Sequence, residues 1–427
     1  MSKPILIVQG GQYGSEGKGQ VAAALCQRRN IDYAVRTGAV NAGHTVIHKN
    51  YTFKMQQLPT GFVNPGTRLI IGAGAYINPE ILAEECRLVS GILGENIRDR
   101  LVIDYRAALH TDLHQDASQR SGRHWGIGAT GKGTAEAIVD KMMNRNKGYK
   151  LFIDTLGANE DGYLSADTSA LLNNAYDQGK SILIEGTQGT HLDFHLGPYP
   201  FVTSRMTSAA NWIAECGLSP NLDYEIVLVC RTYPIRVAGN SGPLPHETSW
   251  PTLARRINLR LSQLDKPLLV NPAAIDQFEW VGDAIAAKDR FTLPSGQARR
   301  WDFHRWTPLE RHTYREALSE MHQEIWHELS GDNRKELSKL FEMTTVTKKL
   351  RRIAGFDHDT VRESIRRERP NYIVLTFLNY VFPEIWGAGA IENREISHYV
   401  GEMEDELGCP IRAVTTGPRA EHYVEVD

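Results

Sequence analysis

A glycine-rich run near the N-terminus carries the strongest chemical signal in the chain. It lies between a short apolar run and a stretch with helical spacing, and its sequence is Gly10-Gly11-Gln12-Tyr13-Gly14-Ser15-Glu16-Gly17-Lys18-Gly19. Glycines let backbone N–H groups turn toward phosphate oxygens, and a helix N-terminus adds positive dipole charge. Lys18 adds a point charge, so the run predicts a phosphate-binding loop rather than a mere connecting turn. It is not a standard P-loop, because Gln12 replaces the required glycine and Gly19 the hydroxyl residue that holds magnesium.

A histidine follows the next expected strand, within Asn41-Ala42-Gly43-His44-Thr45. A lone histidine is most often a satisfied structural residue. His44, however, lies just beyond the strand expected to neighbour the phosphate loop. We therefore predict that it donates to an oxygen that gains negative charge during a reaction.

Polar, glycine-punctuated runs recur at Gly128–Gly133, Glu185–Thr190 and Tyr199–Ser204. Each alone is typical of a turn. Several such runs at strand ends indicate two nucleotide-sized ligands in one cleft. Thr344–Thr347 precede a basic run, Lys348–Arg352, which is either a solvated helix face or a clamp for a carboxylate or phosphate.

Buried strands alternate with helices along the chain. The apolar runs that predict strands are Ile5–Val8, a run ending at Arg36, Leu69–Ile71, Leu101–Ile103, Ser181–Ile184, Ile226–Val229 and Tyr372–Leu375. Asn78 and Pro79 cap a helix expected to reach Leu88. This alternation predicts an α/β fold: a mostly parallel central sheet with a P-loop-like phosphate-binding loop, helical elaborations, and ligands at the strand carboxyl ends.

Length and composition predict an ordinary globular protein, with one large α/β unit or two smaller ones. The 427 residues are 41% hydrophobic with a net charge of −3, which argues against partners held by bulk electrostatics, such as nucleic acid or membrane. Five scattered cysteines, no signal peptide and no apolar run of about 20 residues predict a cytoplasmic protein. We expect a single domain over residues 1–427. A divergent, insertion-like segment at about 240–343 carries five tryptophans and is expected to be mostly helical near its end.

In this order the motifs resemble the adenylosuccinate synthetase family almost end to end; residues 240–343 match poorly. The motifs that carry the resemblance are Gly14–Gly19, Asn41–Thr45, Gly128–Gly133, Glu185–Thr190, Tyr199–Ser204, Thr344–Arg352 and Thr416-Gly417-Pro418. The resemblance implies a ligase that uses Mg²⁺ and a nucleoside triphosphate. The triphosphate phosphorylates O6 of a purine nucleoside monophosphate, and the amine of L-aspartate then displaces phosphate from C6.

The resemblance also implies residue roles. Catalytic residues would be Ser15, Lys18, His44 and Gln188. The phosphate donor would contact Gly14, Glu16, Gly17, Lys18, Gly19, Gly43, His44, Thr45, Asn379, Thr416, Gly417 and Pro418. The purine monophosphate would contact Ser15, Asn41, Ala129, Thr130, Gln188 and Thr203, with Arg145 reaching it from the partner subunit of a homodimer. Thr344, Thr345, Arg351 and Arg352 would bind aspartate, without a fixed assignment of the two arginines, and Ser15 and Gly43 would hold magnesium.

Two departures from the family bear on substrate. Ser15 stands where the family has an aspartate that takes the purine N1 proton, and a serine hydroxyl cannot hold a proton near neutral pH. The smaller, uncharged side chain leaves room for a purine 2-amino group. Asn379 stands where a carboxylate reads guanine; an amide offers one donor and one acceptor, which suits adenine. Phe377, in place of a lysine, is predicted to stack on that base.

Both departures resemble a viral branch of the family that takes dGMP. That branch would make N6-succinyl-2-amino-2′-deoxyadenylate from dGMP, L-aspartate and ATP or dATP. Two alternatives remain: a divergent adenylosuccinate synthetase that uses IMP and GTP, and an inactive nucleotide-binding or sensing homologue. The sequence also leaves open ribose against deoxyribose and the identity of the general base, for which Glu16 is one candidate.

Overall fold

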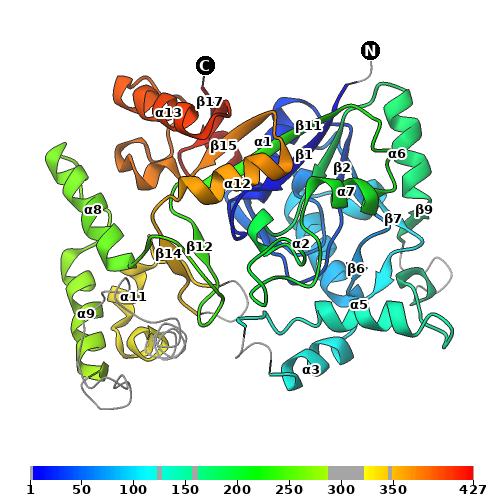
Figure 1. Ribbon diagram of the computed structural model, residues 1–427, viewed down its shortest axis with the longest axis horizontal. Coiled ribbons are helices and arrows are strands. Elements are labelled where there is room, and N and C mark those ends of the chain that lie inside the picture. The colour runs from blue at the N-terminus through cyan, green and yellow to red at the C-terminus, as the bar shows by residue number, and fades with distance from the viewer. Residues whose placement is uncertain (1–2, 123–126, 156–161, 287–321, 345–348, 427) are drawn as a thin grey trace.

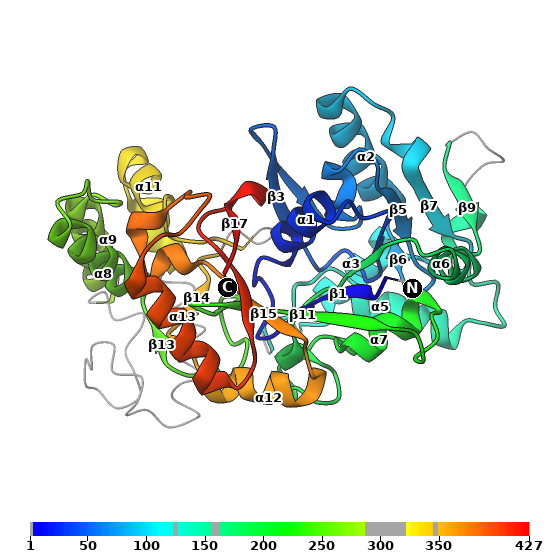
Figure 2. The ribbon, with the colours of Figure 1, turned by 90° about the horizontal axis from the view of Figure 1, so that it is seen from above.

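The computed structural model describes residues 3–122, 127–155, 162–286, 322–344 and 349–426. A long central sheet with helices packed around it forms most of the described chain (Figure 1). Helices α8 (Trp250–Gln263), α9 (Pro272–Ala286) and α11 (Gly331–Leu337) lie together at one side, away from the strands of that sheet, in both ribbon views (Figures 1 and 2).

The central sheet has ten strands within the described ranges, in the order β17-β16-β15-β11-β1-β10-β2-β5-β7-β9. Neighbouring strands are parallel except for the antiparallel pair β16–β17. The mostly parallel sheet is therefore confirmed, with every predicted strand in it. The strands are β1 (Ile5–Gly10), β2 (Tyr33–Arg36), β5 (Arg68–Ile71), β7 (Leu101–Asp104), β9 (Leu164–Ala166), β10 (Ile182–Glu185), β11 (Tyr224–Arg231), β15 (Tyr372–Thr376), β16 (Ile411–Thr415) and β17 (Tyr423–Glu425).

The strand order corrects one expectation. β10 separates β1 from β2, so the strand before His44 is not adjacent to the strand before the phosphate loop. His44 itself does not end a sheet strand; it begins β3 (His44–His48), which pairs with β4 (Tyr51–Met55) as a separate hairpin. In a parallel sheet, a strand that comes later in the chain can lie between two earlier strands, and the local sequence does not indicate this order.

Helices and small sheets complete the chain. The other α-helices are α1 (Lys18–Arg28), α2 (Pro79–Leu93), α3 (Asp112–Arg120), α5 (Thr134–Met143), α6 (Thr168–Asp177), α7 (Ala209–Cys216), α12 (His358–Glu368) and α13 (Arg394–Leu407). Short strands β12 (Ile235–Arg236), β14 (Arg352–Ala354) and β13 (Glu247–Thr248) form one small sheet, and β6 (Tyr76–Ile77) pairs with β8 (Ala108–Leu109). The 3-10 turns are η1 (Thr60–Val63), η2 (Ile97–Arg100), η3 (Phe152–Thr155), η4 (Thr190–Leu192), η6 (Leu378–Tyr380), η7 (Pro383–Ile385) and η8 (Ala420–His422).

Local signals explain where α2 begins and ends. The Asn78 side chain accepts a hydrogen bond from the backbone N–H of Ile81 at 3.1 Å, and Pro79 occupies the first turn. Gly94, at φ 74°, ends the helix in the left-handed conformation. The predicted cap is thus confirmed, and the helix runs five residues beyond the predicted end.

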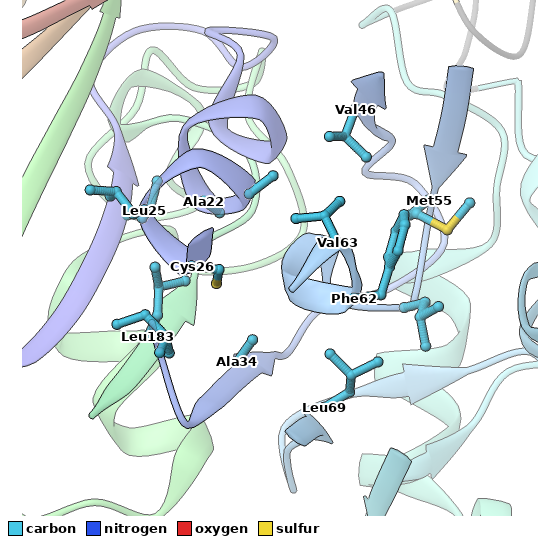
Figure 3. Close-up of a cluster of buried hydrophobic side chains, with 14 of the residues drawn as sticks. Ala22, Leu25, Cys26, Ala34, Val46, Met55, Phe62, Val63, Leu69 and Leu183 are labelled. Atoms are coloured by element: carbon cyan, nitrogen blue, oxygen red, sulfur yellow. The ribbon is translucent and has the colours of Figure 1, made fainter. Parts of the chain in front are cut away.

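An apolar cluster holds the phosphate-loop helix on the sheet. Ala22, Leu25 and Cys26 of α1 belong to one buried cluster with Phe62 and Val63 of η1 (Figure 3), and all five are at most 2% exposed. Figure 3 also shows side chains of the sheet strands β2, β5 and β10 beneath them. Burying a side chain as large as Leu25, Phe62 or Val63 stabilises the folded state by about 1.5–3 kcal/mol. This packing fixes the helix that follows the phosphate loop.

The segment at 240–343 has its own apolar cluster. Trp250 and Leu253 of α8 pack there with Ile275 and Phe278 of α9 and with Phe341. Residues 322–328 are helical, as expected for the end of the segment, whereas its part at 287–321 lies outside the described residues. In the described parts of the chain no helix is long and apolar enough to cross a membrane.

The basic run is not a helix face. Leu350 bridges to Met343, and Arg352 begins β14, which pairs with both β12 and β13. For the described residues of this run, the solvated-helix alternative is therefore wrong. Alternation along the extended chain sends Arg351 and Arg352 in different directions.

Candidate active site

A cavity of about 430 Å³ lies at the carboxyl ends of β1, β10 and β11. It brings together most of the residues singled out from the sequence. Among its lining residues are Gly14, Ser15, Gly17, Lys18, Gly19, Asn41, Gly43, His44, Thr45, Ala129, Thr130, Gln188, Thr344, Lys349, Arg351, Phe377 and Pro418. Ligands of α/β proteins bind at this edge of a parallel sheet, so its position agrees with the prediction.

The phosphate loop reaches its shape through left-handed residues. Gly14 has φ 84°, Ser15 φ 59° and Gly17 φ 92°. Serine is uncommon in this region, which suits glycine and small residues that bond locally. Gly17 precedes the first helical residue, Lys18, so the loop feeds directly into the N-terminus of α1. This is the arrangement expected of an anion-binding helix start.

Glu16 lies beneath the loop and is not part of the cavity lining. Its carboxylate accepts hydrogen bonds from the backbone N–H groups of Gly14 at 2.7 Å and Gln12 at 3.1 Å. It also pairs with Lys18 Nζ at 2.6 Å, and both side chains are at most 2% exposed. All these partners hold Glu16 away from substrate. The carboxylate therefore shapes the loop and orients Lys18, and it is poorly placed to accept a purine proton.

His44 is held by a buried carboxylate that the sequence analysis assigned no role. Its Nδ1 contacts Glu185 Oε1. Glu185 is at the end of β10, where it also pairs with Arg36 Nη1 at 3.2 Å and accepts from the Thr60 hydroxyl at 2.9 Å. The Arg36 guanidinium donates onward to the carbonyl of Ala42 at 2.8 Å. The pair formed by His44 and Glu185 is therefore held by residues from β2, β10 and η1.

The charges around His44 and Glu185 determine which ring nitrogen of His44 carries the hydrogen. Burial would raise the pKa of Glu185, but His44, Arg36 and the donors of Thr60 lower it below its ordinary value. Burial and the nearby Arg36 lower the pKa of His44 to about 4. We therefore take Glu185 as ionised and His44 as neutral, with its hydrogen on Nδ1 facing the carboxylate. In this state Nε2 carries no hydrogen; the donor role predicted from the sequence needs a hydrogen on Nε2 and stays a prediction.

Ser15 lies against an arginine of the aspartate-loop motif. Arg351 Nη1 donates to the Ser15 hydroxyl oxygen at 2.9 Å, and both residues line the cavity. Arg352 instead pairs with Glu247 through two contacts of 2.6 and 2.7 Å and donates to the carbonyl of Gly242. The two adjacent arginines therefore differ: only Arg351 faces the cavity.

A second arginine in the cavity wall was missed. Arg231, the last residue of β11, is 1% exposed, and its Nη1 donates to Glu342 Oε2 at 3.1 Å. Its charge outweighs the effect of burial, so the pKa of the Glu342 carboxyl is lowered. The sequence predicts a strand at Ile226–Val229. Because ligands bind at the carboxyl ends of parallel strands, the residues just after this strand were the signal that could have identified Arg231.

Other predicted residues lie away from the cavity lining. Thr203 is close behind it, with its hydroxyl 3.5 Å from the side-chain nitrogen of Asn41, which lines it. Thr416 is buried and donates to the carbonyl of Ala388, while the carbonyl of Gly417 accepts from Gln20. Three further predicted residues complete the account: Arg145 is exposed, Asn379 is buried at 2% exposure, and Thr345 lies outside the described residues.

The predicted magnesium ligands differ in how well they fit. Within the described ranges, no group of three or more His, Cys, Asp or Glu side chains is placed to hold a metal ion. Mg²⁺ at phosphate-transfer sites takes one or two protein oxygens and relies on substrate phosphates, which needs no such group. Gly43 lines the cavity and offers a carbonyl. The guanidinium on the Ser15 hydroxyl disfavours a second cation there, so Gly43 is the better candidate.

Comparison with known proteins finds similar proteins over nearly the whole length of the chain. A family model described as adenylosuccinate synthetase matches residues 7–155 and 155–385. The match runs through residues 240–343, which the sequence analysis had set apart as divergent. The adenylosuccinate synthetase of Pyrococcus horikoshii is 28% identical over 426 residues, covering 99% of this chain and 98% of that protein. That of Methanococcus vannielii is 38% identical over 246 residues, covering 57% of this chain and 69% of that protein.

Two solved structures share the fold. One is the cyanophage S-2L succinoaminodeoxyadenylate synthetase, PurZ, bound to dGMP and to dATP as an energy donor. It has a TM-score of 0.67 and 22% identity and covers all of this chain and 96% of its own. The other is the fully ligated adenylosuccinate synthetase of Plasmodium falciparum, with a TM-score of 0.65, 17% identity and full coverage of both chains.

Proposed function

Because this chain belongs to the adenylosuccinate synthetase family, whose members are ligases that form a carbon–nitrogen bond, we propose a substrate set for it. The set is dGMP, L-aspartate and ATP or dATP, and the product is N6-succinyl-2-amino-2′-deoxyadenylate. The observation that carries the proposal is Ser15: an uncharged residue, hydrogen-bonded to Arg351, at the position where the family has an aspartate.

The reaction explains the form of the site. The C6 oxygen of a 6-oxopurine is a poor leaving group, so transfer of the terminal phosphoryl to O6 must come first. The amine of aspartate then forms the C6–N bond as inorganic phosphate leaves. Such a transfer needs alignment and charge neutralisation, which the loop N–H groups and Lys18 supply. Magnesium, bound through Gly43 and the nucleotide phosphates, would add positive charge at the transferred group.

The acceptor proposal rests on the chemistry at position 15. A carboxylate there would be larger and would crowd a purine 2-amino group, whereas a hydroxyl leaves room for that group. Arg351 occupies one acceptor position of the hydroxyl, which leaves the other for a purine N–H. The cyanophage enzyme of the same fold was solved with dGMP and dATP, the pair that we propose to test here.

The donor proposal rests on Asn379 and Phe377. Asn379 is buried, and its Oδ1 has no hydrogen-bond partner among the described residues. A buried acceptor without a partner costs free energy, which an exocyclic amine would recover. Adenine presents such an amine at C6 beside the acceptor N1, which matches the one acceptor and one donor of the amide, whereas guanine presents two donors, N1–H and the 2-amino group. Phe377 lines the cavity, whereas Asn379, two residues further along the chain, is not in its lining.

Arg351 is the arginine that we assign to L-aspartate. It lines the cavity, and its hydrogen bonds go to the neutral groups Ser15 and the carbonyl of Met343. It can therefore exchange a neutral partner for a substrate carboxylate, which gives a stronger, charge-assisted bond. Arg352 is already paired with Glu247, so we do not assign it to the substrate carboxylates.

A second candidate is adenylosuccinate synthesis from IMP and GTP. It is favoured by the full-length similarity to the Pyrococcus horikoshii enzyme. One experiment separates the two: the product mass is recorded for each pairing of dGMP, GMP and IMP with ATP, dATP and GTP, in the presence of aspartate and magnesium. Faster turnover of dGMP with ATP or dATP supports the proposal. Faster turnover of IMP with GTP overturns it, and tight nucleotide binding with no product indicates a sensing homologue.

A further inference from the structure

An aromatic ring in the cavity wall is covered on one side by a cation. The guanidinium carbon of Arg231 lies 3.6 Å from the centroid of the Phe377 ring. That is well within the distance of an attractive cation–π contact, and the arginine is only 1% exposed. Both residues line the reaction cavity. A desolvated stack of this kind is held more tightly than one at an exposed surface.

The cation in this stack is itself fixed. Glu342 pairs with both terminal nitrogens of Arg231, and its carboxylate also accepts from the Tyr380 hydroxyl at 3.0 Å. The Tyr380 ring packs edge-on against Phe377, with centroids 5.3 Å apart. Planar bidentate pairing leaves the guanidinium one orientation, with its flat face toward the ring.

The backbone of Phe377 is anchored as well. Its N–H donates to the Thr415 hydroxyl at 3.1 Å, and its carbonyl accepts from the Thr232 hydroxyl at 2.7 Å. Phe377 has φ 58°, a left-handed conformation that is unusual for a bulky residue and needs such support. The ring lies beside the phosphate loop, where a Cβ on Gly17 would come within 3.6 Å of Phe377 Cε2.

We infer that Arg231 is a positioning residue for the phosphate donor, which holds Phe377 as a preset platform for the donor's purine ring. The inference rests on the proposed function only in that a nucleotide base occupies this part of the cavity. A ring held in one orientation loses little freedom when a base stacks on it. The cation behind the ring also strengthens its stacking on the opposite side. Because stacking does not read base edges, the platform serves any purine triphosphate.

Three variants of the full-length protein test this inference: Arg231→Lys, Phe377→Leu and the double variant. Lysine keeps the charge that pairs with Glu342 but lacks the flat face. Isothermal titration calorimetry measures binding of a non-hydrolysable ATP analogue and, separately, of dGMP. Steady-state assays give the KM for each substrate and kcat. Tyr380→Phe, which removes only the hydroxyl bonded to Glu342, is the matched control, and unfolding curves show that each variant is folded.

We expect Phe377→Leu to weaken binding of the analogue about tenfold and Arg231→Lys to weaken it by a smaller factor, with the Kd of dGMP unchanged within about twofold. In the double variant, Arg231→Lys should add little, because its effect passes through the ring. Equal loss of dGMP and analogue binding, additive effects, or a fall in kcat alone would overturn the inference. If GTP proves to be the donor, the same pattern with a GTP analogue upholds the platform while the adenine proposal fails.

Discussion

At the scale of single residues, the contact between Ser15 and Arg351 has more than one effect on substrate choice. The hydroxyl leaves Arg351 without an ionic partner on that side, and the Glu342 carboxylate is committed to Arg231. The arginine is then available to a carboxylate that enters with substrate. If the proposed function holds, position 15 should therefore influence aspartate binding as well as the space beside the purine.

A carboxylate at position 15 should change both properties. In Ser15→Asp we expect the new side chain to pair with Arg351, which raises the KM for L-aspartate by about tenfold. The same change should shift preference from dGMP toward IMP, because it crowds a 2-amino group. Steady-state kinetics with both purines checks this, and Ser15→Ala is the control that removes the hydroxyl without adding charge. Unchanged selectivity would mean that the pocket is set elsewhere.

The carboxylate behind His44 should matter for turnover more than for binding. Glu185→Gln keeps the shape but allows the imidazole to carry its hydrogen on the wrong nitrogen, so we expect kcat to fall at least about tenfold. Nucleotide KM values should stay within about threefold. Glu85→Gln is the matched control, because Glu85 is also buried near Arg36 but, among the described residues, accepts hydrogen bonds from backbone N–H groups alone. Equal losses in both variants would assign Glu185 a purely structural role.

At the scale of elements, a buried carboxyl joins two helices beneath the site. Glu368, the last residue of α12, accepts from the backbone N–H of Ala209 at the start of α7 at 3.0 Å. Its other oxygen lies 3.5 Å from the hydroxyl of Thr190, which in turn donates to the carbonyl of Gly10 at the end of β1. Burial raises the pKa of Glu368 to about 7, with Asp193 adding to the effect.

Stability should therefore fall as pH rises through this range. The folded state binds the proton more tightly than the unfolded chain, so the stabilisation is complete below about pH 4.5 and is lost as pH passes 7. In Glu368→Gln this dependence disappears, and the variant should gain on the wild type by about 1 kcal/mol or more between pH 5 and 8. Urea unfolding at both pH values measures it. Glu363 lies on the same helix but is partly exposed, so the unfolding free energy of Glu363→Gln should depend on pH as that of the wild type does. The same pH dependence in Glu368→Gln would contradict the prediction.

At the scale of the whole molecule, α5 exposes apolar side chains close to Arg145. Val139, Met142 and Met143 are 57–69% exposed on this helix, and Arg145 lies two residues beyond its end. Apolar groups gathered in this way mark interaction surfaces. The predicted homodimer, in which Arg145 completes the partner's monophosphate site, would cover them.

Mixing two inactive variants tests that arrangement. Arg145→Ala removes the contribution to the partner, and Lys18→Ala disables the chain's own phosphate loop. Random re-association should give hybrid dimers with one intact site, which restores about a quarter of wild-type activity. Light scattering checks the dimer independently. No recovery in hybrids that are demonstrably formed would place Arg145 outside the active site.

The sequence predicted the strands well because strands buried on both faces are continuous apolar runs. It also predicted which motifs reach the cavity, since parallel strands end at one edge. The insertion of β10 between β1 and β2 depends on contacts between segments far apart in the sequence. The Arg231–Glu342 pair escaped for the same reason, because its residues are 111 positions apart. The antiparallel β17 and the hairpin that begins at His44 pair with strands nearby in the sequence, and neither was predicted.

The left-handed backbone at Ser15 also bears on how such a site changes over generations. Few side chains other than glycine tolerate that conformation, and those that do are mostly short and polar, with Asn and Asp most enriched. A mutation between aspartate and serine can therefore switch the charge of the pocket while the loop keeps its path. The backbone conformation at position 15 therefore admits few residues, and a change from one of them to another alters the chemistry of the pocket in one step.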